Sequence, residues 1–234
     1  MRAVILAGGK GVRLYPVTKV IPKPLVPLGE RPILEILIRQ LKKQAIRRIT
    51  LAVGYMARLI ESYFHDGSAL GVEIDYSWEP ASLGTAGPLS LIEGLNDTFL
   101  VMNADVLTNL NFNDLVAHHK RHGGVLTIAA YQRQVTIDLG VIINDGDFRI
   151  KDYVEKPSSP YLVSMGIYVF EPEVMDYIPK HCHLDFPDLV KLLLHDRQEV
   201  NYYPFSGYWL DIGRHEDYTQ ASEEFHSLQG ELGL

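Results

Sequence analysis

The chain has 234 residues, 47% of them hydrophobic, and a formal net charge of −7, which suits one globular core. No basic block is present, so a nucleic-acid partner is not expected. The single cysteine, Cys182, excludes an internal disulfide, and no apolar stretch has the length of a membrane span or a signal peptide; we therefore expect a cytoplasmic protein without a membrane partner.

The chain opens with a short apolar run, Ala3–Ala7, closed by glycines and followed by basic residues among prolines. A run of this length with this boundary is typical of a buried strand. Glycines leave the backbone N–H groups of a loop open to phosphate oxygens, and Arg13 and Lys23 add positive charge beside it. The segment therefore predicts a polyphosphate site. The loop glycines are Gly8, Gly9 and Gly11.

Two common phosphate loops do not match this segment. The dinucleotide fingerprint G-x-G-x-x-G fits Gly9 and Gly11 but meets Leu14 where its third glycine belongs. The P-loop G-x-x-x-x-G-K-[ST] fails because Lys23 lies between two prolines. What remains is G-G-x-G-x-R-L-x-P-x-T followed by P-K-P. It resembles the signature of the sugar-nucleotide pyrophosphorylases, the nucleotidyltransferases that make NDP-sugars from an NTP and a sugar 1-phosphate.

The resemblance covers nearly the whole chain. Leu83-Gly84-Thr85-Ala86-Gly87 is most similar to the loop of the mannose-, glucosamine- and heptose-1-phosphate guanylyltransferases. Tyr208–Gly213 is similar to the family's late W-x-D-[IV]-G element. Two positions depart from the family pattern, since Val12 stands where Thr or Ser is usual and Ala104 stands where many members have Gly.

Strand-like and helix-like runs alternate through the first half of the chain. Such alternation predicts a parallel sheet with helices on its faces. In these sheets ligands bind at the carboxyl ends of the strands, where the glycine loop and Asp105 both fall. The predicted strands are Ala3–Ala7, Ile49–Val53, Val72–Ser77 and Phe99–Asn103, and the predicted helices are Ile33–Lys43, Tyr55–His65 and Gly84–Leu95.

The second half is richer in strands. We interpret residues 1–234 as one Rossmann-like α/β nucleotidyltransferase domain with a mixed, mainly parallel sheet flanked by helices. Residues 1–115 are its expected nucleotide-binding half, 116–212 its strand-rich sugar-binding half and 213–229 a C-terminal helix. The cluster of His118, His119 and His122 lies on a polar helix and is expected to form a solvated face. The later strands are predicted at Val125–Tyr131, Gly140–Ile143, Arg149–Val154 and Leu162–Phe170, and a strand pair near Val200–Ile212 lies between helices Asp185–His195 and His215–Ser227.

Making an NDP-sugar requires a sugar phosphate oxygen to attack the α-phosphorus of an NTP in line and to expel pyrophosphate. Because the second pKa of a phosphate monoester is about 6, the attacking group is already ionised near neutral pH and needs no protein base. The protein therefore has to position the substrates and neutralise their charge, which requires Arg, Lys and acidic metal ligands rather than a Ser/His/Asp triad. Asp105, at the end of a buried strand beside the phosphate loop, suits a Mg²⁺ ligand.

The resemblance implies a role for each site residue. Arg13, Lys23 and Asp105 are the implied catalytic residues, and Asp105 and Asp211 are the implied Mg²⁺ ligands. Glu155 would accept hydrogen bonds from sugar hydroxyls, and Lys156 would hold the sugar's phosphate, with Gly140 and Gly166 lining the sugar. The implied nucleotide-binding residues are Leu6, Ala7, Gly8, Gly9, Gly11, Arg13, Lys23, Glu79, Gly84, Thr85 and Asn103.

Several alternatives stay open at this point. Glu79 can accept the adjacent N–H donors of guanine, which favours GTP, but uracil and thymine also carry an N–H donor, so a UTP- or dTTP-using glucose-1-phosphate-type enzyme fits as well. A non-catalytic paralogue that senses a sugar nucleotide would usually lose the charged catalytic positions, which this chain keeps. A transferase for phosphocholine or another non-sugar phosphate is a third alternative. The sequence leaves open which sugar is used and whether the chain forms a homo-oligomer.

Overall fold

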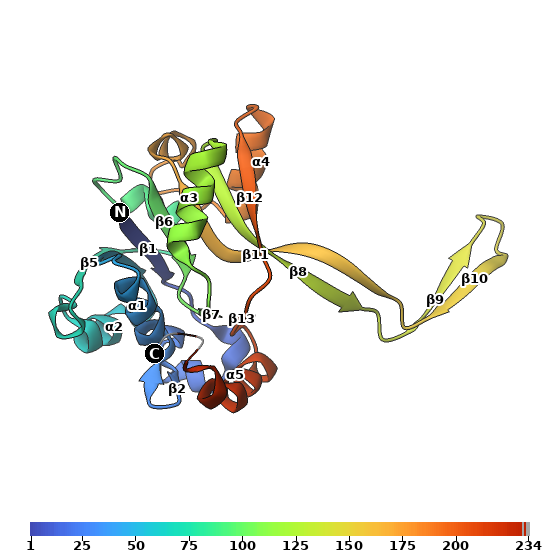
Figure 1. Ribbon diagram of the computed structural model, residues 1–234, viewed down its shortest axis with the longest axis horizontal. Helices are drawn as coiled ribbons and strands as arrows, with labels where there is room; N and C mark the ends of the chain where they lie inside the picture. Colours follow the sequence, from blue (N-terminus) through green and yellow to red (C-terminus); the bar gives the residue numbers. More distant parts are fainter. Residues whose placement is uncertain (231, 233–234) are drawn as a thin grey trace.

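The computed structural model describes residues 1–230 and 232 and confirms an α/β fold. Within these residues the central sheet has seven strands in the order β12-β8-β11-β6-β1-β4-β5 (Figure 1). Its strands are β1 (Arg2–Ala7), β4 (Arg48–Val53), β5 (Glu73–Trp78), β6 (Phe99–Asn103), β8 (Leu126–Thr136), β11 (Ser158–Phe170) and β12 (Val200–Phe205). The small two-stranded sheets use β2 (Pro27–Leu28), β3 (Arg31–Pro32), β7 (Val106–Thr108), β9 (Gly140–Asn144), β10 (Ile150–Glu155) and β13 (Trp209–Asp211).

The middle of the sheet is parallel and buried on both faces. β1 pairs in parallel with β4 on one side and with β6 on the other, and Val4 and Ile5 are fully buried. Strands buried on both faces have continuous apolar sequences, which explains why these strands can be read from the sequence. β11 runs antiparallel to β6 and β8, and β12 joins the edge in parallel with β8. The sheet is therefore mixed, with a parallel centre.

Helices cover both faces of the sheet. α1, α2 and α3 pack on one face through residues such as Leu37, Ile60 and Leu115, and α4 packs on the other through Leu189 and Leu193. Both core layers contain residues from before and after position 115, so the two halves of the chain share their packing. The helices are α1 (Ile33–Lys43), α2 (Ala57–Phe64), α3 (Phe112–His122), α4 (Phe186–His195) and α5 (His215–Leu228).

A small second sheet brings the last part of the chain back to the carboxyl end of β6. β13 pairs antiparallel with β7 and places Asp211 opposite Val106, one residue beyond Asp105. The Ile212 N–H donates to the Asp105 carbonyl (3.0 Å). Phe225 of α5 packs with Ile212 in a third apolar cluster, which holds this connection in place.

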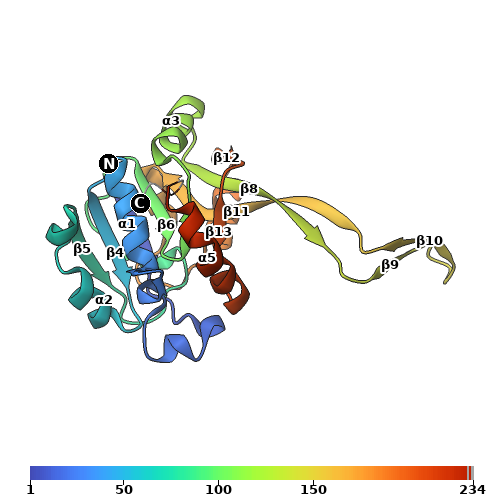
Figure 2. The ribbon, with the colours of Figure 1, turned by 60° about the horizontal axis from the view of Figure 1, so that its bottom comes forward.

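The outer parts of β8 and β11 leave the body as a two-stranded ribbon (Figures 1 and 2). These strands pair with one another out to Thr136 and Ser158, whereas β8 pairs with β12 only as far as Tyr131 and β11 pairs with β6 only from Ile167. The hairpin β9–β10 lies at the far end of the ribbon. Residues 132–163, which comprise the ribbon and the hairpin, are termed the arm.

The predicted helix at Gly84–Leu95 is wrong, because the structure has only a 3₁₀ turn there, Gly87–Leu91. Gly84 has a φ of 80°, which lies outside the α-helical region. The Ala86 N–H donates to the Leu184 carbonyl (2.9 Å), so the segment is held by a tertiary contact rather than by helical hydrogen bonds.

The other predicted helices and strands are present. Ile33–Lys43 and Phe99–Asn103 have the predicted bounds, and the remaining elements have shifted ends. β8 and β11 are longer than predicted and reach Thr136 and Ser158. The strands expected near Val200–Ile212 form as β12 and β13, but β12 pairs with β8 and β13 pairs with β7, so they are not partners of each other.

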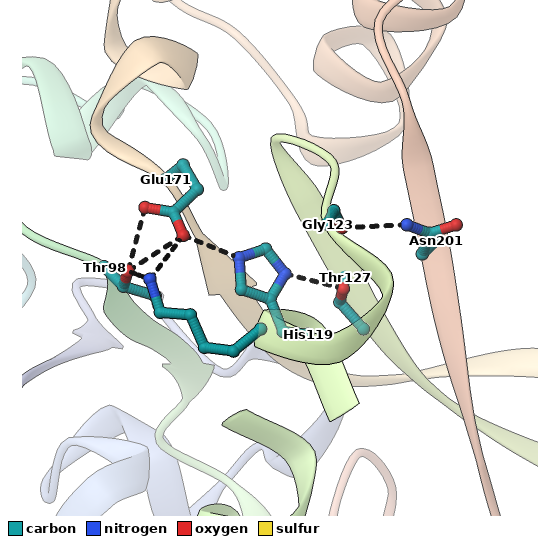
Figure 3. Close-up of polar contacts among 7 residues, drawn as sticks. Thr98, His119, Gly123, Thr127, Glu171 and Asn201 are labelled. Carbon is teal, nitrogen blue, oxygen red and sulfur yellow. Dashed lines mark hydrogen bonds and ion pairs between the residues drawn. The ribbon is translucent and has the colours of Figure 1, made fainter. Parts of the chain in front are cut away.

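The predicted solvated face on α3 is wrong for His119, which is buried and 1% exposed. Its Nδ1 lies 2.8 Å from Thr127 Oγ1 and its Nε2 lies 3.0 Å from Glu171 Oε1 (Figure 3). Lys120 Nζ donates to the same carboxylate (2.7 Å), and the Thr98 hydroxyl contacts both of its oxygens (2.8 and 2.9 Å). This cluster ties α3 to the start of β6 and the end of β11, at the sheet edge opposite Asp105.

We expect acidification to destabilise the fold in two stages through this cluster. Burial lowers the pKa of His119, although Glu171 opposes the shift. Below the usual pKa of 6.5 the unfolded chain therefore binds a proton more readily than the folded chain, and the free energy of unfolding falls. Burial alone would raise the pKa of Glu171, but hydrogen bonds from Lys120, Thr98 and His119 outweigh it and lower that pKa from its usual 4.5. A second loss of stability therefore follows below pH 4.5. Urea unfolding over a pH series measures both stages.

His119→Leu should cost about 1–3 kcal/mol at neutral pH, because Thr127 and Glu171 each lose a hydrogen-bond partner. The same change should remove the contribution of His119 to the first acid stage and leave that of His118, whose pKa burial also lowers. It should shrink the second stage, because Glu171 loses one of the hydrogen bonds that lower its pKa. The matched control is His195→Leu, since the His195 side chain is 85% exposed on α4. A first stage of undiminished size in His119→Leu would contradict this account.

Candidate active site

The glycine loop follows β1 at the centre of the sheet. Gly11 has a φ of 60°, and its carbonyl accepts a hydrogen bond from Thr18 Oγ1 (2.7 Å). A Cβ at this position would lie 3.1 Å from side-chain atoms of both Thr18 and Lys23. Only glycine adopts such a backbone at little cost, so Gly11 allows the tight turn that brings Lys23 against the loop. At the other end of the loop, the Tyr55 N–H donates to the Gly8 carbonyl (3.1 Å).

A pocket of about 380 Å³ lies at the carboxyl ends of β1 and β6. Its volume suits a small-molecule site. The structure brings all the residues predicted to bind nucleotide to its wall: Leu6, Ala7, Gly8, Gly9, Gly11, Arg13, Lys23, Glu79, Gly84, Thr85 and Asn103. It is also lined by Asp105 and by residues to which the sequence assigned no role: Val12, Pro24, Ser82, Pro88 and Ala104. Each of these additional residues adjoins a motif in the sequence, and that adjacency is the signal that could have identified them.

Two carboxylates from distant parts of the chain meet beside this pocket. Asp105 follows β6 and Asp211 ends β13, and Lys23 forms an ion pair with Asp105 Oδ2. The other oxygen of Asp105 is buried and has no hydrogen-bond partner within the described residues. Burial and the charge of Asp105 raise the pKa of Asp211, while the positive charges of Lys23 and Arg13 oppose that shift. The two aspartates predicted to bind metal thus lie together.

Arg13 approaches this cluster at Gly213. A Cβ on Gly213 would lie 3.3 Å from both Arg13 Nη1 and Asp211 Oδ2, so this glycine leaves room for the two side chains. His215 Nε2 lies 2.7 Å from the Tyr15 carbonyl and ties the start of α5 to the loop that carries Arg13. Positive and negative groups are therefore concentrated at one wall of the pocket, as polyphosphate binding with a metal ion requires.

Glu79 lies on another wall of the pocket. Burial raises its pKa, and the Leu83 N–H, which donates to Oε2 at 3.3 Å, only partly opposes this. Its Oε1 lies over Gly8, where an added Cβ would collide with it. Within the described part of the chain no basic side chain forms an ion pair with Glu79, so the carboxylate can accept hydrogen bonds from a ligand.

Two predicted site residues shape the pocket through the fold. The Thr85 hydroxyl accepts the Phe186 N–H at the start of α4 (2.7 Å) and donates to Asp185 (3.3 Å), so it supports the wall. Gly166 has a φ of 72°, and a Cβ there would lie 2.6 Å from Asn103 Nδ2. Gly166 therefore permits β11 to pass close to the pocket.

The remaining predicted sugar-phosphate residues lie on the arm, away from the pocket wall. Gly140 and Glu155 face each other in the β9–β10 hairpin. Lys156 follows the hairpin and forms an ion pair with Asp138 (2.6 Å) in which both side chains are exposed. The structure thus brings the predicted nucleotide and metal residues together, but it does not bring Gly140, Glu155 and Lys156 to them.

Comparison with known families agrees with this geometry. The family model described as Nucleotidyl transferase matches residues 2–227. The chain belongs to the nucleotidyl transferase family. This membership confirms the resemblance read from the glycine loop and from the Trp209-Leu210-Asp211 element.

Individual curated relatives are similar along nearly the whole of this chain. A UTP–glucose-1-phosphate uridylyltransferase of Synechocystis is 36% identical over 241 residues, which cover 94% of this chain and 62% of that protein. A mannose-1-phosphate guanyltransferase of Saccharomyces cerevisiae is 35% identical over 231 residues, which cover 95% of this chain and 64% of that protein. The chain thus spans about three fifths of the length of these curated relatives.

Solved structures share the fold along nearly the whole chain. HddC from Yersinia pseudotuberculosis matches with a TM-score of 0.74 and 27% identity, over 96% of this chain and 99% of that chain. HddC was also solved in complex with GMP-PN. Among residues 1–230 and 232, none of the helices combines the length and apolar character needed to cross a membrane.

Proposed function

We propose that this chain transfers a nucleotidyl group from an NTP to a sugar 1-phosphate, releasing pyrophosphate and forming an NDP-sugar. The observation that carries the proposal is a pocket lined by the glycine loop, Lys23 and Asp105. Beside it lies Asp211, close enough to Asp105 for the charge of Asp105 to raise its pKa. The names of the Synechocystis and yeast relatives support it, since both are sugar-1-phosphate nucleotidyltransferases.

We propose Mg²⁺ as the cofactor, with Asp105 and Asp211 as its protein ligands. The donor set fits a hard cation, because one Asp105 oxygen is buried without a partner among the described residues and a second carboxylate, Asp211, lies close enough to be affected by the charge of Asp105. In the described residues no group of three or more candidate metal ligands occurs. That suits Mg²⁺, which commonly uses one or two carboxylates and takes its other ligands from water and substrate phosphates. When bound, Mg²⁺ would neutralise charge on those phosphates.

The chain's own residues then position and neutralise the substrates. The loop glycines offer backbone N–H groups to phosphate oxygens, and Arg13 and Lys23 offset the charge of the departing pyrophosphate. The attacking sugar phosphate is already ionised, so no protein group has to remove a proton. Glu155 and Lys156 are proposed to hold the sugar hydroxyls and the sugar phosphate.

Pyrophosphate release in the presence of Mg²⁺ tests this function. The purified chain is incubated with each common NTP, alone and with each member of a panel of sugar 1-phosphates and phosphocholine. Release that requires both one NTP and one sugar 1-phosphate supports the proposal. Release from an NTP with phosphocholine, but with no sugar 1-phosphate of the panel, would move the assignment to a non-sugar substrate. Clear binding of an NDP-sugar without release for any pair would instead favour a non-catalytic sensing role.

We further propose that guanine is the preferred base. Guanine presents adjacent N1–H and N2–H₂ donors that match the two oxygens of a carboxylate, whereas uracil and thymine present one N–H between two carbonyl oxygens. Glu79 supplies such a carboxylate in the pocket. The complex of HddC with GMP-PN supports this choice. The name of the Synechocystis relative points to UTP and keeps a UTP- or dTTP-using enzyme as the alternative.

Glu79→Gln should lower kcat/KM for GTP by roughly 5- to 150-fold, which corresponds to about 1–3 kcal/mol for one bidentate base contact. Its effect on UTP and dTTP should be smaller, because an amide offers both a donor and an acceptor to those bases. The measurement is kcat/KM for each NTP at saturating sugar 1-phosphate. Glu173→Gln, at an exposed position, is the matched control. Equal losses for all NTPs would contradict a base-selecting role for Glu79.

A further inference from the structure

The β9–β10 hairpin carries apolar side chains that its own chain does not cover. Ile142, Ile150 and Tyr153 are 54%, 65% and 57% exposed, and Phe148 is fully exposed. The strand register places Ile142, Ile150 and Tyr153 on one face and Ile143, which is 43% exposed, on the other. A two-stranded hairpin has no core of its own, and contiguous exposed apolar groups mark an interaction surface. The hairpin therefore has the character of a docking element.

A second uncovered apolar patch lies on residues 10–24, here termed the basic loop. This loop has four basic and no acidic side chains, whereas residues 140–155 of the hairpin have four acidic and two basic ones. The two surfaces are therefore complementary in charge as well as in apolar character. The exposed apolar residues of the basic loop are Val12, Tyr15, Val17 and Val20, at 57%, 38%, 39% and 70%.

The two surfaces do not meet within one chain. Figures 1 and 2 both show β9–β10 at the far end of the ribbon, remote from the body. Among the described residues, none from 132–163 lines the pocket, to which the basic loop contributes Gly11, Val12 and Arg13. Because one chain carries both complementary surfaces and does not join them, a second copy of the chain is the partner with matching chemistry.

We propose that two copies of this chain exchange arms, so that the β9–β10 hairpin of each copy packs on the basic loop of the other. A two-fold arrangement uses the same pair of surfaces twice and closes the assembly as a dimer. Since the basic loop forms part of the pocket wall, the exchange brings Glu155 and Lys156 of one copy to the pocket of the other. This last consequence rests on the proposed function, whereas the exchange of arms does not.

Light scattering and sedimentation over a concentration series test the exchange without reference to activity. Wild-type protein should be a dimer, and Phe148→Asp and Val20→Asp, one on each surface, should each weaken dimerisation by about tenfold or more. Leu194→Asp is the matched control, since Leu194 is 56% exposed on α4 and belongs to neither surface. A wild-type monomer at every concentration, or a dimer that both variants leave unchanged, would overturn the proposal.

Cross-linking distinguishes exchange from closure of the arm on its own chain. In a Cys182→Ser background, one preparation carries Phe148→Cys and another carries Val20→Cys. Exchange predicts a disulfide-linked dimer when the two preparations are mixed and oxidised. A cross-link that forms only within single chains carrying both substitutions shows closure in cis and overturns the exchange.

Mixing catalytically impaired subunits tests the consequence for the pocket. Lys23→Met and Lys156→Ala are each expected to lose most turnover. A mixture should regain activity that neither has alone, because in each mixed dimer one pocket keeps its own Lys23 and receives an arm with an intact Lys156. Mixed dimers that form without regaining activity would overturn this consequence. A wild-type chain that dimerises through its arms but releases no pyrophosphate would refute the proposed function and leave the exchange standing.

Discussion

Asp105→Asn should reduce pyrophosphate release by at least about a hundredfold, the usual effect of removing one preorganised charged or polar group from an active site. The substitution keeps the shape of the side chain but replaces a charged oxygen ligand with an amide. It also removes the charged partner of Lys23. Turnover is measured at saturating substrates over a Mg²⁺ titration, in which the variant should need a higher Mg²⁺ concentration for its residual activity.

The same variant should remain folded, because relief of a repulsion offsets part of the loss of the ion pair with Lys23. Asp105 and Asp211 repel each other, since the charge of Asp105 raises the pKa of Asp211. Loss of one charge relieves that repulsion, and Lys23 retains Asp211 as a nearby anion. The matched control is Asp188→Asn, an exposed aspartate that pairs with Lys191 on α4. Full turnover in folded Asp105→Asn protein would refute the metal assignment.

Lys23→Met should lose both activity and stability. Turnover should fall by about 10²–10³-fold, because a fixed positive charge no longer offsets the reacting phosphates. Lys23 is 9% exposed, and removing one partner of a buried ion pair leaves the other uncompensated at a cost of about 3 kcal/mol. Melting temperature and urea unfolding measure the stability change, and pyrophosphate release measures turnover.

The stability loss in Lys23→Met has a predicted pH dependence. Lys23 lowers the pKa of Asp211, so its removal raises that pKa further above the usual value of 3.8. A carboxyl group whose pKa is higher in the folded than in the unfolded chain destabilises the fold as the pH rises above its unfolded pKa. The loss of stability should therefore be large at neutral pH and shrink toward pH 3.8. Lys191→Met, at an exposed position, is the control and should change neither property. A loss that does not vary with pH would argue against an uncompensated carboxylate.

Much of the fold can be read from the sequence because its central strands are buried on both faces. Phe99–Met102 is continuously apolar and short, and the structure places β6 at the predicted bounds, Phe99–Asn103. α1 was predictable for a related reason, since its apolar residues recur at helical spacing and pack on the sheet at Ile33–Lys43. The 3₁₀ turn at Gly87–Leu91 was not predictable in this way, because its conformation depends on a hydrogen bond to Leu184, which is remote in sequence.

The candidate site also combines features that depend on neighbouring residues with features that only the tertiary structure sets. The glycine loop is local, so the turn at Gly11 and the proximity of Lys23 follow from neighbouring residues. The meeting of Asp105 and Asp211 is not local, because it depends on the pairing of β7 with β13. Only the resemblance to a family could anticipate that pairing. The burial of His119 is also a tertiary result, since Glu171 and Thr127 reach it from other elements.

The sequence by itself determined the alternating α/β elements, because these depend on hydrophobic periodicity, and the glycine loop, because it depends on short-range backbone geometry. The resemblance to a family then pointed to many of the residues that line the pocket. The tertiary structure alone decided where the arm points. The family resemblance points to Gly140, Glu155 and Lys156 as candidate sugar-phosphate residues. The pairing of β8 with β11 nevertheless places them away from the pocket of their own chain. Strand pairing over such sequence separations is set by packing of the whole sheet, and for that reason no local pattern could have predicted it.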